Sequence, residues 1–212
     1  MTTLSRRAFT SGVSAFALIS IAAPLGAVMA QAQPDAAAFV SDFTRKGITD
    51  ILSAPIDNTD KQQRFREMFK TYFDLPGIGR FVLARYWAAA TPDEQAKFTQ
   101  LFEDAIVYTW SRRFSEYNAQ TLMVQGQQAD GKDGTLVKST IVGNNGSHFG
   151  VDWRLRKRPE GFKVLDIVIE GVSMAITYRQ DYATVISQTG SFAGLLAQME
   201  KQVARLKAQQ GA

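Results

Sequence analysis

The spacing of apolar positions changes near Ala119, and the change divides the chain into a helical part and a strand part. Before it, apolar side chains recur every three or four residues, which is typical of helices that bury one face. After it they alternate with polar ones, until helical spacing returns beyond Gly171. The pattern therefore predicts helices, then strands, then helices.

The first part of the chain carries start signals for four helices. The strongest is Thr91 followed by Pro92 and Glu94, which reads as a capping box with proline at the first helical position. Asp60 and Asp74 are expected to cap two earlier helices, because aspartate at this position accepts a free backbone N–H. The four helices are expected over residues 35–52, from Asp60, from Asp74, and from Thr91 to about residue 117.

Four strands follow, and glycine-bearing loops separate them. Short loops imply that neighbouring strands run antiparallel. The clearest connection is Arg158-Pro159-Glu160-Gly161, where proline and glycine favour a tight reversal and hence a hairpin. The strands are expected over residues 121–125, 136–142, 148–156 and 162–170.

Two further helices complete the pattern. Ser173 is suited to cap the first, Gly190 to end it, and Ser191 to cap the second. Helices, a strand meander and then helices predict an α+β fold with a four-stranded antiparallel curved sheet and helices packed over one face.

The first thirty or so residues have the order of an export signal. Arg6 and Arg7 form a twin-arginine pair, an apolar run over residues 13–23 follows, and small residues surround Ala30. We expect residues 1–32 to be a cleaved twin-arginine-type signal and 33–212 to be a single domain. The alternative is an N-terminal membrane helix, but the run is shorter than the roughly 18 to 20 residues that span a bilayer. The absence of cysteine excludes lipid attachment at an N-terminal cysteine.

Charge and composition exclude several classes of function. The formal charge of +4 falls to +2 without the signal, because the signal contains Arg6 and Arg7 and no acidic residue. The chain contains no basic run with interleaved aromatic residues, which is the pattern that indicates nucleic-acid binding. Without cysteine there is no disulfide framework, and a chain of 212 residues favours one domain with a sizeable core.

Candidate catalytic groups are few. His148 is the only histidine, so a histidine-rich metal site is excluded. Asp166 and Glu170 share a strand face, yet four residues of strand separate their backbones by about 13 Å, too far for a carboxylate pair. We interpret them as ion-pairing groups at the strand end, with Arg80, Arg85 and Arg179 as candidate partners.

Several motifs resemble the MlaC or toluene-tolerance family of periplasmic lipid carriers. They are FKTYFD at residues 69–74, IGRFVLARYW at 78–87, ATPDEQ at 90–95 and FKVLDIVIEGVS at 162–173, with Tyr178-Arg179 following. They occur in the family's order and cover most of the chain beyond the signal. Ala84 stands where relatives often have glycine before Arg-Tyr-Trp.

The resemblance implies an NTF2-like cone with an apolar pocket between helices and sheet that holds phospholipid acyl chains. It implies a periplasmic carrier that shuttles between an inner-membrane ABC transporter with an MCE-type component and an outer-membrane lipoprotein complex. It also implies a monomer without a cofactor other than the bound lipid. Some relatives are associated with hopanoid biosynthesis, so phospholipid and hopanoid both stay open as cargo.

The pocket lining is expected to combine aromatic residues from the helices with mainly β-branched residues from the sheet. The arginines named above are candidates to meet a phosphate at the pocket mouth. The strand at 162–170 is apolar on both faces, so Lys163, Leu165, Ile167 and Ile169 are an alternative set. The expected lining is Phe69, Phe73, Ile78, Phe81, Val82, Tyr86, Phe102, Ile106, Val124, Val137, Ile141, Val151, Trp153, Leu155, Val164, Val168 and Val172.

A different class of function stays open beside the carrier. Ketosteroid-isomerase-type enzymes use a similar cone with a tyrosine and a carboxyl group in an apolar pocket. Tyr86 and Asp166 are the residues of this chain that could take those roles. Their spacing in the sequence gives no independent support, and aromatic stripes that simply fill a core are a third possibility.

Overall fold

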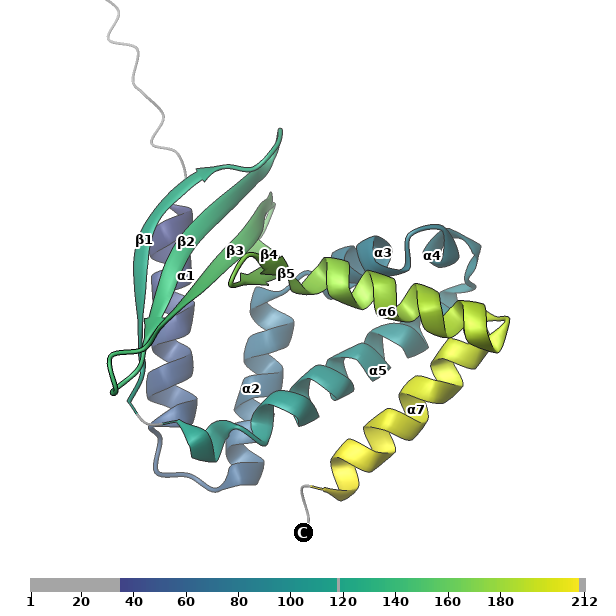
Figure 1. Ribbon diagram of the computed structural model, residues 1–212, viewed down its shortest axis with the longest axis horizontal. Helices are drawn as coiled ribbons and strands as arrows, with labels where there is room; N and C mark the ends of the chain where they lie inside the picture. The colour runs from purple at the N-terminus through teal and green to yellow at the C-terminus, as the bar shows by residue number, and fades with distance from the viewer. Residues whose placement is uncertain (1–34, 118, 210–212) are drawn as a thin grey trace, which may run out of the picture. The chain divides into compact units, whose positions relative to one another are not determined.

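The computed structural model describes residues 35–117 and 119–209, so the expected export signal lies outside the described residues. Within them, no helix is both long and apolar enough to cross a membrane. Figure 1 shows the order of the elements. They are α1 (Ala36–Gly47), a π-helical turn (Ile48–Leu52), α2 (Asn58–Tyr72), α3 (Leu75–Leu83), α4 (Arg85–Ala89), α5 (Pro92–Ser111), a 3-10 turn (Phe114–Glu116), β1 (Thr121–Ala129), β2 (Gly134–Val142), β3 (His148–Arg158), β4 (Gly161–Ile169), β5 (Val172–Ser173), α6 (Met174–Thr189) and α7 (Phe192–Ala208).

The helix starts follow the capping residues of the sequence, with one exception. Thr91 and Glu94 form the expected capping box, and Ser173 and Ser191 cap α6 and α7. The prediction for α2 was wrong, because the carboxylate of Asp57 accepts the N–H of Asp60 at 2.8 Å and the helix begins one turn earlier.

The expected helix over residues 91–117 is also shorter than the pattern indicated. α5 ends at Ser111, and a separate 3-10 turn buries Phe114. The ring of Phe114 meets that of Phe65 edge-on, with centroids 5.4 Å apart. The end of α5 and the 3-10 turn therefore allow Phe114 to pack against Phe65 of α2.

The sheet is an antiparallel meander in which each strand pairs with the next one along the chain. It has five strands rather than the expected four. The fifth is the two-residue β5, which pairs with Val168 and Ile169. Glu170 and Gly171 both have positive φ, at 49° and 79°, and this tight reversal returns the chain to β4 within two residues.

The buried side chains form two separate hydrophobic clusters. The sheet cluster joins α1 to β2, β3 and β4, and the helix cluster joins α2, α3, α5, α6 and α7. In Figure 1, α1 lies across one face of the sheet, while α5, α6 and α7 extend from its β4–β5 side. Phe73 is the partly buried residue that packs against both clusters.

A β-bulge in β4 decides which side chains face α1. Arg154 pairs with Asp166 and Leu155 pairs with Val164, which leaves Leu165 as the extra residue. Val164 belongs to the sheet cluster, whereas Leu165 packs against the helix cluster. Neither parity of this strand therefore forms one continuous face, because the bulge exchanges the two sides.

The segment Phe73-Asp74 fastens the helices to the sheet. Phe73 forms an isolated parallel bridge with Val164, and the Asp74 N–H donates to the Val164 carbonyl at 3.0 Å. The Asp74 carboxylate accepts the Gly77 N–H at 2.8 Å and both Nε and Nη2 of Arg158, at 3.0 and 2.5 Å. One carboxylate thus caps α3 and holds the β3–β4 hairpin.

The pKa of Asp74 reflects this double role. Burial alone would raise it, but the hydrogen bonds from Arg158 and from the Gly77 N–H hold the pKa below its ordinary value of 3.8. The contribution of this carboxylate to stability is therefore complete above the pKa of an unfolded aspartate. It is lost as the pH falls through the lowered pKa of the folded state.

We expect Asp74→Asn to lower the free energy of unfolding by about 2 kcal/mol at neutral pH, because it removes the charge-assisted bonds to Arg158 and the negative charge at the N-terminus of α3. Urea unfolding of the wild type and of Asp74→Asn across a pH series measures this difference in the free energy of unfolding. The difference between them should shrink at acid pH, where the wild-type carboxyl is protonated too. Asp133→Asn, in an exposed turn, is the control. A difference that stays constant into acid would contradict the assignment.

Ala84 separates α3 from α4 in a conformation that suits glycine, with φ 47° and ψ −118°. We expect Ala84→Gly to raise the free energy of unfolding by about 1 kcal/mol, because the strain of a Cβ at positive φ disappears. Ala88→Gly, in the ordinary helical backbone of α4, should instead lower it by about 1 kcal/mol. Thermal unfolding of the two variants beside the wild type measures both changes in stability. A loss of stability in Ala84→Gly as well as in Ala88→Gly would contradict backbone strain at Ala84.

Candidate functional site

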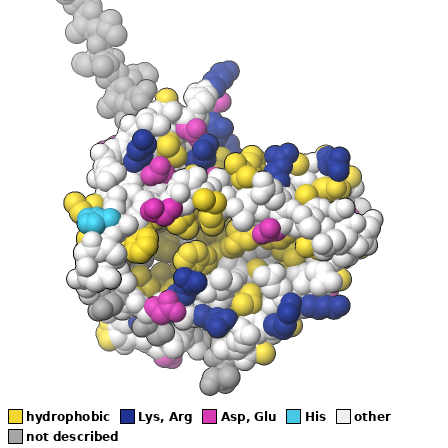
Figure 2. All heavy atoms as spheres, in the orientation of Figure 1, with side chains coloured by type: hydrophobic (Ala, Val, Ile, Leu, Met, Phe, Trp, Pro, Cys, Tyr) yellow, Lys and Arg dark blue, Asp and Glu magenta, His cyan; other side chains and the backbone are white. Residues whose placement is uncertain are grey.

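A recess opens on the face of the molecule shown in Figure 2, and hydrophobic side chains line its interior. In the same orientation, Figure 1 has the sheet on one side of it and α2, α5 and α6 on the other. The recess therefore lies where the two hydrophobic clusters face each other without merging into one core.

The strand register places an apolar row on the α1-facing side of the sheet. Leu122 pairs with Ile141, and Ile141 pairs with Phe149, so all three side chains point to one face. Deeper positions on that face are closed, with Val137 fully buried and Val151 5% exposed, whereas Phe149 is 50% exposed. This end of the sheet is apolar and incompletely covered.

The helices supply a series of aromatic rings. Phe65, Phe69 and Phe73 follow one another along α2, with ring centroids 6.4 Å and 4.5 Å apart. Phe69 is buried, while Phe65 and Phe73 are half-buried. Phe69 belongs to the helix cluster and Phe73 packs against both clusters, so the series leads to the point where the helices meet the sheet.

The expected lining residues separate into three groups. Two groups belong to the helix cluster and to the sheet cluster or their margins. The third group lies outside both clusters: Val168 is buried, whereas Phe81 and Val172 are 44% and 55% exposed. Val168 pairs with Asp152, on the face opposite Val164, because of the bulge in β4. The helix cluster contains or contacts Phe69, Phe73, Ile78, Val82, Tyr86, Phe102 and Ile106, and the sheet cluster contains or contacts Val124, Val137, Ile141, Val151, Trp153, Leu155 and Val164.

The sequence interpretation left four apolar residues near these surfaces out of the expected lining, and only Leu122 of them packs against a cluster. Leu122 and Phe149 have the same parity as Val124 and Val151, so the alternation of β1 and β3 contained the signal. Phe65 was expected on the apolar side of α2 but not at the site. Phe114 had no signal, because the local pattern predicted a continuous helix.

The expected arginine partners of Asp166 and Glu170 were wrong. Asp166 lies opposite Arg154 in the β3–β4 pair, and the Arg154 Nε is 3.6 Å from its carboxylate. The same carboxylate accepts the Ser173 hydroxyl at 2.5 Å and the Ala175 N–H at 2.8 Å. Glu170 accepts the N–H of Gly150. Both carboxylates therefore fasten the turn between β4 and α6.

The three arginines named from the sequence lie elsewhere. Arg85 donates to the hydroxyl of Tyr86 at 3.0 Å, and Arg179 lies over the ring of Phe81 at 5.4 Å. Arg80 is exposed on α3. Among the described residues, no ion pair joins any of them to a carboxylate.

The geometry gives no support to the isomerase alternative. The Tyr86 hydroxyl is occupied by Arg85, and the Asp166 carboxylate is occupied by Ser173, Ala175 and Arg154. His148 is exposed at the start of β3. Within the described ranges, no three histidine or carboxylate side chains are placed to hold a metal ion.

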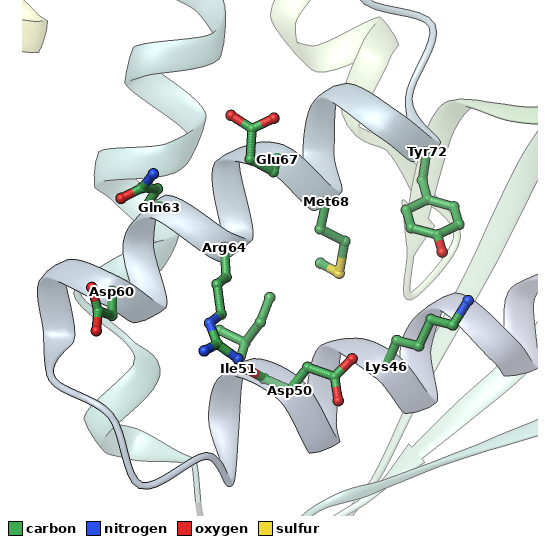
Figure 3. Close-up of a pocket in the computed structure, with 9 residues that line it drawn as sticks. All are labelled: Lys46, Asp50, Ile51, Asp60, Gln63, Arg64, Glu67, Met68 and Tyr72. Carbon is green, nitrogen blue, oxygen red and sulfur yellow. Dashed lines mark hydrogen bonds between the residues drawn. The ribbon is translucent and has the colours of Figure 1, made fainter.

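A second hollow, of about 560 Å³, lies between α1 and α2. Figure 3 shows that charged side chains dominate it, with Arg64 reaching toward α1. The Nη1 of Arg64 donates to the Asp50 carbonyl at 3.1 Å. Only Ile51, Met68 and Tyr72 give it apolar surface, so it is unsuited to a hydrocarbon chain.

The fold and the recess together define an α+β domain with an apolar hollow between helices and sheet, the arrangement of proteins that bind hydrophobic ligands. The chain belongs to the MlaC family, whose model, described as "MlaC protein", matches residues 44–201.

Two relatives agree with this assignment. The toluene tolerance protein ttg2D of Pseudomonas putida is 24% identical over 119 residues, which cover 56% of this chain and 55% of the relative. The chain thus matches about half the length of that curated protein. A phospholipid-binding protein from Ralstonia solanacearum, solved in complex with a phospholipid, is 26% identical with a TM-score of 0.74, and the match covers 82% of this chain and 99% of the other.

We expect Phe73→Ala to lower the free energy of unfolding by about 3 kcal/mol, because this ring packs against both clusters. Phe81→Ala, at an exposed position, should cost less than about 1 kcal/mol. Chemical denaturation of the two variants beside the wild type provides the measurement. Equal losses would show that Phe73 does not join the two cores.

Proposed function

We propose that this protein is a carrier that binds the acyl chains of a phospholipid in the recess between its two hydrophobic clusters. The observation that carries the proposal is the apolar recess itself (Figure 2). To its wall we assign the incompletely covered row Leu122, Ile141 and Phe149 on the sheet and the half-buried rings on α2. A protein that needed only a stable core would gain by closing this space.

The physical demand on such a carrier is shelter from water. Exposing an acyl chain costs about 0.8 kcal/mol for each CH₂ group, so a free lipid crosses an aqueous compartment too rarely to be useful. An apolar recess replaces the bilayer interior at nearly equal free energy, which keeps loading and release close to balance. Neither step needs an acid, a base or a metal ion, so we propose binding and transfer rather than catalysis.

Family membership supports the cargo and the setting of this proposal. The Ralstonia solanacearum relative is a phospholipid-binding protein solved with a phospholipid. For a MlaC family member we infer a periplasmic site of action, reached through the twin-arginine-type signal. The proposed route leads between an inner-membrane ABC transporter with an MCE-type component and an outer-membrane lipoprotein complex. Hopanoid is the second candidate cargo.

The sharpest test compares two neighbouring residues of β1. Leu122 faces the sheet cluster, whereas Met123 points to the other side and is 59% exposed. We expect Leu122→Glu to reduce the lipid that copurifies with the protein by more than about tenfold, because an unpaired charge disfavours an apolar site. Met123→Glu introduces the same charge and should retain the lipid. Lipid extraction and mass spectrometry of protein purified from the periplasm measure both.

Circular dichroism and thermal unfolding of both variants separate lost binding from lost folding. A fill-in variant at the same row, Ile141→Trp, tests the space without a charge and should also reduce the bound lipid. If wild-type protein carries no lipid, or if Leu122→Glu and Met123→Glu retain equal amounts, the recess is not the lipid site.

A further inference from the structure

A cleft of about 440 Å³ lies between the β3–β4 hairpin, α3 and the start of α6. It is distinct from the apolar recess and from the charged hollow between α1 and α2. Four arginines line it, namely Arg80, Arg154, Arg156 and Arg158, against the two carboxylates of Asp130 and Asp166. The lining therefore has a formal charge of +2. Arginine side chains that converge in a cleft are suited to phosphate, because the guanidinium presents several donors in one plane.

Two of the four arginines already have partners. Arg158 is bound by Asp74, and Arg154 lies 3.3 Å from Asp130 and 3.6 Å from Asp166. Arg80 and Arg156 form no ion pair with a carboxylate in the part of the chain that the structure describes. These two guanidinium groups are therefore available to an external anion.

Exposed apolar side chains adjoin this positive charge. Phe81 and Ile176 line the cleft and are 44% and 47% exposed. They are two of the six large apolar side chains that are exposed among the described residues. Arg179, which covers the ring of Phe81, adds a further cation.

The cleft lies on the other side of the sheet from α1. Arg154 alternates with Trp153 along β3, and Trp153 packs edge-on against Phe43 of α1 with centroids 5.0 Å apart. The arginines of the cleft and the apolar row of the recess therefore lie on opposite faces of the sheet, and Leu155 is the residue of the sheet cluster that also lines the cleft. A ligand at the arginines does not require the recess to be empty.

We infer that this cleft docks the protein onto an anionic bilayer, with Arg80 and Arg156 binding a phospholipid phosphate and Phe81 and Ile176 entering the interface. Cations beside partly exposed apolar side chains are the combination that holds proteins at an anionic membrane surface. A water-soluble phosphate would use the arginines alone and would gain nothing from the apolar rim. The inference goes beyond the proposed function, since it concerns a surface separate from the recess.

The test uses the full mature protein with its copurified lipid, in flotation with phosphatidylcholine vesicles that contain or lack phosphatidylglycerol. We expect binding to the anionic vesicles that weakens as salt is added. Arg80→Gln with Arg156→Gln should weaken it about 30-fold, because each cation near an anionic surface contributes about fivefold. Arg205→Gln on α7, which does not line the cleft, is the matched control and should bind as the wild type does.

A second pair of variants tests the apolar rim. Ile176→Ser should weaken binding to vesicles of either composition, whereas Met123→Ser, at a more exposed position on β1, should not. Thermal unfolding and the amount of copurified lipid should be unchanged in every variant. This readout keeps a failure at the cleft distinct from a failure at the recess.

Several results would overturn the inference. One is an absence of binding to anionic vesicles by the wild type, and another is equal binding by the double arginine variant and by Arg205→Gln. Glycerol phosphate that competes as strongly as vesicles would identify a soluble phosphate as the ligand instead. Unchanged vesicle binding with weakened capture of a purified partner protein would identify the cleft as a protein-docking surface.

Discussion

The structure depends on the junction that Phe73 and Asp74 make with β4. The ring of Phe73 packs against both hydrophobic clusters, and the Asp74 N–H extends the backbone pairing to Val164. The Asp74 carboxylate then joins α3 to the β3–β4 hairpin through Arg158. This segment, together with Leu165 and Asp166 of β4, holds helices and sheet together without a continuous shared core, so a recess can exist beside the junction.

Two cores in place of one would allow an apolar interior to serve the proposed binding. Leaving apolar surface partly uncovered lowers stability, since each buried CH₂ group contributes about 0.8 kcal/mol. A ligand chain that covers the surface recovers this free energy upon binding, which makes the bound state more stable than the empty one. The carboxylates that sequence spacing made conspicuous, Asp166 and Glu170, instead fasten the turn that positions α6.

Local signals in the sequence predicted a large share of the fold. The capping residues Asp74, Thr91, Ser173 and Ser191 start helices where expected, because capping involves neighbours within three residues. The strands were recognised by their alternation or, for residues 162–170, by an apolar run that ends at Gly171. β5 was missed because two residues are too few for a period. The family resemblance, carried by motifs such as residues 78–87, is confirmed by the match to the MlaC family.

The sequence by itself determined the order of helices, strands and helices, the antiparallel meander and the family, since each is encoded by local periodicity or by contiguous motifs. Only the tertiary structure decided which faces meet. The bulge at Leu165 exchanges the two sides of β4, and Arg154 rather than a helix arginine lies opposite Asp166. The recess and the arginine cleft combine residues from distant segments, and no spacing along the chain measures how closely packed elements approach one another.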